Sequence, residues 1–342
     1  MKRPVTIKDI AKMLGISKST VSRAIRGSEE INPETKKRIM DLVEELDYQP
    51  NAFARSLLKH RSNTIGVVIP AIENSFFANL ISGVQHVAHS KGYNVMICQT
   101  NDSFDREVSD IRTLCRHQVD GIILSLSSET KSFDHLQSVI DKDIAFVMAD
   151  RTTHKIEAPR ILVNDRDGAY NATKHLIENG YRNIIHLAGP ESLEIANLRA
   201  QGFSDAMEEA GSTDIDSKIF RCPFREEKAR ELTLELLKDG VKFDAVFAAS
   251  DKIAVGAMMA IKEAGLYIPD DVALVGFTDL PMAKLLTPSL TTIQQPAQEM
   301  GRKAAELLLE SIEDKESHDS SDYVMTTRLI QRESTKSKVG KA

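Results

Sequence analysis

The chain has 342 residues, of which 42% are hydrophobic and 27% charged, with a formal net charge of −6 at pH 7. This length is ample for two or three folding units with real cores, and the total charge by itself argues against a protein that binds nucleic acid. The distribution reverses that conclusion, because residues 1–62 carry 13 Lys and Arg against 8 Asp and Glu, whereas the rest carries 31 against 42. A basic unit on an acidic body is the charge layout of a DNA-binding head with a sensor domain behind it.

Residues 6–46 predict three short helices around a small apolar core. We expect Thr6 to cap the first helix, Gly15 to end it, and Ser17 to cap the second. Asn32 precedes Pro33 at the start of the third helix. The apolar positions at helical spacing are Ile7, Ile10, Ala11, Leu14, Val21, Ala24, Ile25, Ile39, Leu42, Val43 and Leu46.

The outward face of the second helix carries Lys18, Ser19, Ser22 and Arg23, which are short, polar or cationic and start at its N-terminus. A recognition helix presents such a surface to the major groove of DNA. The alternative is a small helical bundle with a merely solvated polar face.

Residues 47–62 join this head to the body. The segment from Asn51 to Leu58 has helical propensity but is too short to be stable alone in water. The pattern by itself leaves open whether this segment forms a helix or is an ordinary linker.

From Ser62 onward the sequence alternates between β-branched runs and helical segments. Strands are expected at 65–69, 94–98, 121–124, 144–149, 184–188, 245–248 and 272–276. Helices are expected at 76–91, 105–117, 133–141, 167–179, 197–210, 227–238, 252–264 and 296–311. Strands that alternate with helices of 10–15 residues indicate βαβ units with parallel sheets, and two doubly wound sheets of similar size account for the number of elements.

Four motifs identify a resemblance that runs the length of the chain. They are Thr6-Ile7-Lys8-Asp9-Ile10-Ala11, Ser17-Lys18-Ser19-Thr20-Val21-Ser22-Arg23, Asn32-Pro33-Glu34-Thr35 and Tyr48-Gln49-Pro50-Asn51-Ala52. With them the chain resembles the LacI/GalR family of bacterial transcription regulators. The resemblance implies an all-α helix-turn-helix head and an α/β body of the periplasmic-binding-protein type, with two doubly wound parallel-sheet lobes.

This resemblance divides the chain into four parts. They are a DNA-binding domain at 1–50, a hinge helix and linker at 51–62, a two-lobe domain for effector binding and dimerisation at 63–334, and a flexible tail at 335–342. It also implies that helix 296–311 belongs to the first lobe and that Tyr323–Thr327 returns to the second.

The resemblance also assigns DNA contacts. Lys18, Ser19 and Arg23 are expected at base edges, whereas Thr6, Thr20, Ser22 and Asn32 are expected at phosphates. Asn51 is placed in the DNA-contacting set, and Leu57 becomes an apolar wedge that enters the minor groove. The usual family asparagine near the end of the recognition helix is Arg26 here.

Ligands in open α/β sheets bind beyond the carboxyl ends of the strands, so the residues that follow each strand are the candidate effector site. The expected set is Phe76, Phe77, Ser125, Asp150, Arg199, Asp251, Thr278 and Gln295. Arg199 begins the family's Arg-x-x-Gly-Phe motif, whereas Thr278 stands where the family usually has an acid. Carboxylates, amides and one arginine over aromatic rings suit a neutral polyol, although Arg199 could instead hold a phosphate or carboxylate.

Cys98, Cys115 and Cys222 lack metal-ligand spacing and are odd in number, which predicts inert thiols in a reducing compartment. No apolar run approaches ~20 residues and none follows Lys2 and Arg3, so we expect neither a membrane span nor a secretory signal, and a cytoplasmic protein.

No nucleophile elbow, metalloprotease motif or Gly-rich phosphate loop is found, so we expect no enzymatic activity, cofactor or metal. A solute-binding protein without a DNA role is disfavoured by the basic head.

The expected protein is a homodimeric repressor of a near-palindromic operator, controlled by a small effector that is a sugar. Two alternatives stay open: a body that docks a partner protein, and a regulator with a purine corepressor. The short tail after Leu329 has no leucine heptads, which favours a dimer over a tetramer.

Overall fold

A computed structural model describes residues 5–25, 27–46, 48, 61–212, 218–314 and 320–338. The chain divides into two compact units, Met1–Ser62 and Asn63–Ala342. The expected hinge residues 51–60, with Asn51 and Leu57, lie outside the described residues, and so does Arg26.

The first unit contains three helices, α1 (Ile7–Leu14), α2 (Lys18–Ile25) and α3 (Pro33–Glu45). Their predicted apolar faces meet in one core, in which Ile10, Val21 and Ile39 are completely buried. Gly15 ends α1 with φ 68°, a left-handed conformation that glycine adopts without strain.

Hydroxyl and amide side chains begin the next two helices as expected. The Ser17 hydroxyl oxygen accepts a hydrogen bond from the Thr20 amide at 3.0 Å. Asn32 Oδ1 accepts one from the Glu34 amide at 2.9 Å, with Pro33 at the first helical position. These caps satisfy amides that have no partner inside the helix, so local sequence fixes where α2 and α3 start.

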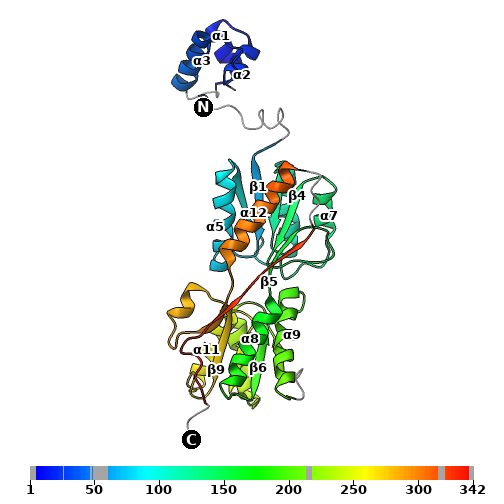
Figure 1. Cartoon of the computed structure of the whole chain (residues 1–342), viewed down its shortest axis with the longest axis vertical. Coiled ribbons are helices and arrows are strands. Elements are labelled where there is room, and N and C mark those ends of the chain that lie inside the picture. The colour runs from blue at the N-terminus through cyan, green and yellow to red at the C-terminus, as the bar shows by residue number, and fades with distance from the viewer. Residues whose placement is uncertain are drawn as a thin grey trace. The chain divides into compact units, whose positions relative to one another are not determined.

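The second unit consists of two lobes, each built on a six-stranded sheet (Figure 1). In spatial order the first sheet contains β11 (Asp322–Met325), β5 (Arg160–Val163), β4 (Ala145–Ala149), β3 (Gly121–Leu124), β1 (Thr64–Ile69) and β2 (Asn94–Gln99). The second contains β12 (Arg328–Ile330), β10 (Thr291–Gln294), β9 (Ala273–Thr278), β8 (Ala245–Ala248), β6 (Ile184–Ala188) and β7 (Ile219–Arg221). All described strand pairs are parallel except β10 with β12.

Helices cover both faces of each sheet. The first lobe has α5 (Ser75–Ser90), α6 (Phe104–Arg116), α7 (Asp134–Ile140) and α12 (Ala297–Glu313). The second has α8 (Asp165–Glu178), α9 (Glu194–Glu209), α10 (Glu226–Lys238), α11 (Asp251–Glu263) and the 3-10 turn η2 (Pro281–Lys284). Neighbouring residues of β1 show the alternation, because Val67 packs under α5 and α12 whereas Val68 packs under α6 and α7. The predicted fold class is therefore confirmed.

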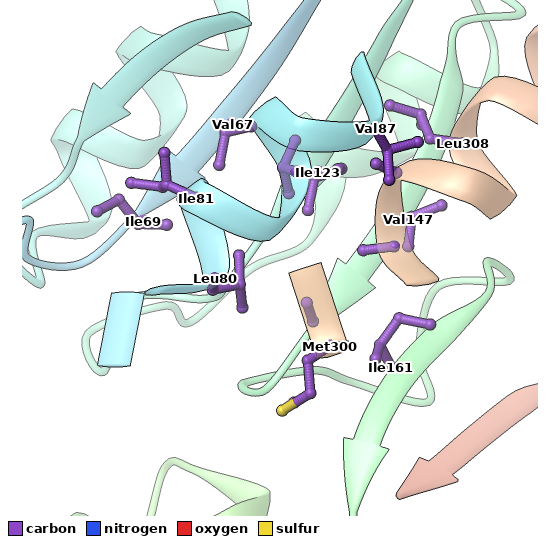
Figure 2. Close-up of a cluster of buried hydrophobic side chains, with 14 of the residues drawn as sticks. Val67, Ile69, Leu80, Ile81, Val87, Ile123, Val147, Ile161, Met300 and Leu308 are labelled. Atoms are coloured by element: carbon purple, nitrogen blue, oxygen red, sulfur yellow. The ribbon is translucent and has the colours of Figure 1, made fainter. Parts of the chain in front are cut away.

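The core of the first lobe lies between its sheet and the pair α5 and α12, where Val67, Ile123, Val147 and Leu308 converge (Figure 2). Gly83 of α5 and Gly301 of α12 let these helices approach closely. A Cβ at Gly301 would stand 1.9 Å from the Leu80 carbonyl oxygen. Helix α12, far along the chain from α5, is thereby fixed to the first lobe, as expected.

The last crossing between the lobes differs from the expectation for Tyr323–Thr327. Strand β11, which contains Tyr323, pairs with β5 in the first sheet. The chain crosses only after Met325, and β12 then joins the second sheet beside β10 (Figure 1). The expectation that Tyr323 lies in the second lobe is therefore wrong, because β11 finds its partner through β5, a strand too short to be predicted.

The tail expected to be flexible from Thr335 is ordered in its first part. Thr335 is buried, with its hydroxyl 2.9 Å from His175 Nε2. The Tyr181 hydroxyl donates to the Lys336 carbonyl, and the Lys338 amide donates to the Asn179 carbonyl. Residues 335–338 therefore belong to the second lobe, and 339–342 lie outside the described residues.

Candidate functional site

The outward face of α2 presents the side chains expected to read bases. Lys18, Ser19 and Arg23 are exposed, whereas Val21 and Ala24 on the opposite face are buried. Arg23 Nη1 lies 3.1 Å from Glu30 Oε2 in an exposed ion pair. Exposed pairs contribute little to stability, so this one does not prevent the guanidinium from reaching a base.

Three of the four residues expected at phosphates, Thr6, Thr20 and Asn32, lie at or near helix N-termini, whereas Ser22 lies in the second turn of α2. The Thr6 amide and hydroxyl both donate to Asp9 Oδ2, at 2.9 and 2.6 Å. Asn32 caps α3, Thr20 lies 2.8 Å from the Ser17 hydroxyl, and Ser22 is half-buried on α2. Helix N-termini attract anions, so the positions of Thr6, Thr20 and Asn32 are compatible with phosphate contacts while also stabilising the helices.

A cleft lies between the two lobes of the second unit, at the carboxyl ends of their strands. It encloses about 420 Å³ of empty space, part of it open to solvent. Its lining is Asn74, Phe76, Phe77, Asp150, Arg151, Ile195, Arg199, Phe224, Ser250, Asp251, Lys252, Thr278, Leu280 and Gln295. Seven of the eight expected effector residues are therefore brought together, although they come from distant parts of the chain.

Ser125 is the expected residue that does not line the cleft. Its side chain is buried, and its hydroxyl oxygen accepts a hydrogen bond from the Arg151 amide at 3.4 Å. It therefore lies behind the cleft and supports the segment that follows β4.

The two adjacent phenylalanines enter the cleft from the N-terminal end of α5. Asn74 caps this helix through its side chain, which accepts from the Phe76 amide at 3.1 Å. The rings of Phe76 and Phe77 meet edge to face, with centroids 5.2 Å apart. Both are at least 95% buried, so they contribute to the core as well as to the cleft wall.

Arg199, on α9, is 2% exposed, and each of its three guanidinium nitrogens has a protein partner. Its guanidinium contacts Asp165 Oδ1 at 2.7 Å, donates to the Ala249 carbonyl at 2.6 Å and lies 3.8 Å from the centre of the Phe277 ring. Asp165 is the first residue of α8. Sequence reasoning started this helix at Asp167 and therefore missed the acid that holds Arg199.

Asp150, which follows β4, has φ 65° and is buried. Burial raises its pKa to about 6, against the opposing effects of the charges on Arg151 and Arg199 and of the neighbouring Gln295 side chain. A strained backbone and a perturbed acid at a cleft are typical of functional sites.

Asp251 is the first residue of α11, and its two carboxylate oxygens already have partners. One accepts from the Leu280 amide at 2.7 Å and the other from the Thr292 hydroxyl at 2.5 Å. Burial raises its pKa to about 6, against these hydrogen bonds.

Thr278, at the end of β9, has φ 128°, which strains a β-branched residue.

Arg151 and Phe224 line the cleft but were not among the expected residues. Arg151 Nη1 donates to Asp102 Oδ1 at 2.5 Å, and its guanidinium lies 5.7 Å from the Phe77 ring and 5.4 Å from the Phe224 ring. The position of Arg151 directly after Asp150, at the end of β4, could have identified it from the sequence. Phe224 follows β7, a strand of three residues that the sequence pattern did not reveal.

Polar contacts join the lobes beside the cleft. The Ser192 hydroxyl donates to the Ser128 carbonyl at 2.6 Å, and His154 Nε2 lies 2.8 Å from Glu194 Oε1. Lys252 of the second lobe lies 3.9 Å from Glu73 of the first. These contacts hold the lobes together over the cleft in the conformation described here.

The cleft is equipped for hydrogen bonding and stacking. Within the described ranges no group of three or more His, Cys, Asp or Glu side chains could hold a metal ion. In the same part of the chain no helix is both long and apolar enough to span a membrane.

The three cysteines Cys98, Cys115 and Cys222 are free, and burial raises the pKa of Cys98 and Cys222 to about 11.

Two family models match the chain, one on each unit. The model described as bacterial regulatory proteins, lacI family, matches residues 6–51. The model described as periplasmic binding proteins and sugar binding domain of LacI family matches residues 62–333.

Three known proteins illustrate the similarity. The ribose operon repressor of Halalkalibacterium halodurans is 36% identical over 97% of each chain. The HTH-type transcriptional repressor PurR of Vibrio vulnificus is 35% identical over 97% of this chain and 98% of its own. A LacI family transcriptional regulator from Enterococcus faecium, solved with bound ribose, is 28% identical with a TM-score of 0.71, and covers 80% of this chain and 99% of its own.

Proposed function

Since this chain belongs to the LacI family of bacterial regulatory proteins, we propose that a neutral sugar binds in its interlobe cleft and controls operator binding. The general function of the chain, without the identity of its effector, follows from its membership of this family. The chain is a DNA-binding transcription repressor with an effector-binding body, and not an enzyme.

The balance of charges in the cleft carries the proposal of a neutral ligand. The three lining cations each have a carboxylate within 4.0 Å: Asp102 for Arg151, Asp165 for Arg199 and Glu73 for Lys252. Among the described residues no cation forms an ion pair within 4.0 Å of Asp150 or Asp251, the two lining acids, although the charges on Arg151 and Arg199 act on Asp150 from further away. The cleft is therefore net negative near neutral pH, which disfavours a phosphorylated or acidic ligand.

The remaining features favour a polyol. Asp150 and Gln295 offer acceptors and donors, and Phe76, Phe77 and Phe224 supply apolar surface. Sugars present hydroxyls around the ring edge and C–H groups on its face, which match such a lining. Ribose is our first candidate, and it is supported by the name of the Halalkalibacterium repressor and by the ribose bound to the Enterococcus regulator.

A purine is the second candidate ligand, because the Vibrio relative is named PurR. A purine base is also neutral and stacks on aromatic rings, so the charge balance does not exclude it. Thr278 stands where the family usually has an acid that could accept a sugar hydroxyl or a base N–H, so this position does not separate the two ligands.

We infer that operator binding uses the head in the expected way. Lys18, Ser19 and Arg23 would read base edges, because they are exposed on one face of α2. Thr6, Thr20, Ser22 and Asn32 would contact phosphates, Asn51 would belong to the DNA-contacting set, and Leu57 would enter the minor groove. Binding to chromosomal DNA would place the protein in the cytoplasm.

A homodimer would present two such heads to a near-palindromic operator. Exposed apolar side chains support a self-associating body. Ile72 and Ile97 of the first lobe are 49% and 39% exposed, and Leu285 of the second lobe is 76% exposed. Ile97 lies on β2, an edge strand whose outer side has no neighbour in the described sheet.

The effector would control operator binding by changing the relative position of the two lobes. A sugar that contacts both lobes favours one relative position of the lobes, and can shift operator affinity only by its different affinities for the two states. The interlobe contacts of Ser192, His154 and Lys252 would be made or broken in that change.

Thermal unfolding of the full chain with a ligand panel tests the proposal. The panel contains D-ribose, other monosaccharides, disaccharides, ribose 5-phosphate, hypoxanthine and guanine. We expect Tm to rise with a neutral sugar at millimolar concentration and not with ribose 5-phosphate. A rise with a purine alone, or with no small molecule, would contradict the sugar, and the second result would point to a docked partner protein.

A further inference from the structure

The loop that follows β3, residues 125–130, is held in place by two acidic side chains from the α6 region. Glu107 is completely buried and accepts from the Ser127 amide at 2.6 Å and the Thr130 hydroxyl at 2.9 Å. Asp102 accepts from the Ser128 amide at 2.9 Å. The backbone of this loop is therefore fixed on the side that faces the first lobe.

Asp102 makes a second contact through the same oxygen. Its Oδ1 accepts from Arg151 Nη1 at 2.5 Å as well as from the Ser128 amide. Burial tends to raise the pKa of Asp102, but the Arg151 charge and the hydrogen bonds from Ser128 and Arg151 outweigh it, so the pKa is lowered. Asp102 is thus a carboxylate at neutral pH and holds two groups at once.

Arg151 and Ser128, the two residues that Asp102 holds, both contact the second lobe. The Arg151 guanidinium lies 5.4 Å from the centre of the Phe224 ring, and the Ser128 carbonyl accepts from the Ser192 hydroxyl at 2.6 Å. Asp102 itself does not belong to the cleft lining. One carboxylate outside the cleft therefore sets two first-lobe groups against two second-lobe side chains.

We propose that Asp102 is a positioning residue for effector binding, which orients Arg151 and the Ser128 carbonyl for contact with the second lobe. The proposal rests on the proposed function of the cleft. It differs from a purely local role for Asp102 in the turn before α6, because it requires energetic coupling to residues of the other lobe.

The first measurement is the Kd of the full chain for D-ribose by titration calorimetry. Asp102→Asn keeps an acceptor for the Ser128 amide but removes the charge that holds Arg151. We expect Kd to rise about 10-fold, because a charge-assisted hydrogen bond is lost. Asp105→Asn, an exposed acid three residues further on, is the matched control and should leave Kd unchanged.

A double variant separates positioning from a local structural role. In the Arg151→Met background, Asp102→Asn should cause no further loss of ribose affinity, because its effect passes through the guanidinium. If the two losses multiply instead, or if Asp102→Asn binds ribose like the wild type, the proposal is overturned.

A ligand-free measurement keeps the test independent of the ligand. The Tm losses of Asp102→Asn and Phe224→Leu should be less than additive, although Asp102 and Phe224 make no direct contact in the described structure. If the wild type binds no compound of the panel, the proposed function fails while this cycle still decides the role of Asp102, and additive losses reject it. If Asp102→Asn does not fold, Ser192→Ala takes its place and must show the same non-additivity with Phe224→Leu.

Discussion

Arg199 and Asp165 form an ion pair that is almost entirely removed from solvent, with both side chains 3% exposed. Nε and Nη2 of the arginine each lie 2.7 Å from the same carboxylate oxygen, while Nη1 donates to the Ala249 carbonyl. The pair joins the N-terminal residue of α8 to the middle of α9 beside the cleft. Burial raises the pKa of Asp165, although Arg199 opposes this effect. Arg199 is therefore a structural cation as well as a cleft residue.

Arg199→Ala should destabilise the body, because it leaves Asp165 buried without its partner. Breaking a buried pair in this way costs about 3–5 kcal/mol of unfolding free energy. Asp165→Asn in the same chain should recover part of the loss. Denaturant unfolding of the wild type and the two variants measures this, and an Arg199→Ala chain as stable as the wild type would contradict the role of the pair. Loss of the effector response in this variant is interpretable only at temperatures where it is folded.

Asp150→Asn should stabilise the ligand-free protein at pH 7. The pKa of Asp150 is raised from 3.8 to about 6, so between these values the native state holds a proton that the unfolded chain has lost. Stability therefore falls as the pH rises through this range, by up to about 3 kcal/mol, since each pH unit corresponds to ~1.4 kcal/mol. Unfolding of both proteins at pH 4, 5, 6 and 7 should show a gain that grows with pH. A constant difference would mean that Asp150 is not the group that titrates, and the same variant should lose the Tm rise with sugar.

Gly276→Ala should weaken the second lobe at Asp251. A Cβ at this position would stand 2.3 Å from Asp251 Oδ1 and 3.0 Å from Leu290 Cδ2. Because Asp251 is held by Thr292 and the Leu280 amide, it cannot retreat without breaking one of these bonds. We expect a loss of about 1–3 kcal/mol, typical of overpacking. Gly276 is not among the glycines with positive φ, so the expected loss comes from this contact and not from backbone strain.

Arg23→Ala should reduce operator affinity by about 1–3 kcal/mol and relax preference at one base pair, if its guanidinium reads a base edge. Gel-shift titration against operators changed at single positions gives both quantities. Arg38→Ala, an exposed cation on α3, is the comparison variant. An unchanged preference at every position would exclude Arg23 from base readout.

Leu57→Ala tests the proposed minor-groove wedge, which the resemblance implies for a position outside the described residues. An apolar wedge unstacks a base step and kinks DNA, so its loss should weaken operator binding and reduce bending. Fluorescence resonance energy transfer between the ends of an operator fragment reports the bend. Equal bending with both proteins would remove Leu57 from this role.

Many of the predicted structural features depend on local sequence alone. The caps at Ser17 and Asn32, the glycine end at Gly15 and the buried face of β1 depend on residues that are neighbours in the chain, and the structure shows them as expected. The strand ends also identified Asp150, Asp251 and Gln295, because parallel strands deliver their carboxyl ends to one edge.

The remaining features depend on contacts between distant residues. No pattern near Tyr323 indicates that β11 pairs with β5, and nothing near Arg151 indicates Asp102 or Phe224 as its neighbours. The sequence by itself identified the family through the resemblance of its motifs, and it determined the two-unit organisation and the α/β class because charge distribution, hydrophobic periodicity and capping can be read over short stretches. Only the tertiary structure decided which acid pairs with which arginine and which strand belongs to which lobe, because those choices depend on sheet order and close packing of segments far apart in the chain.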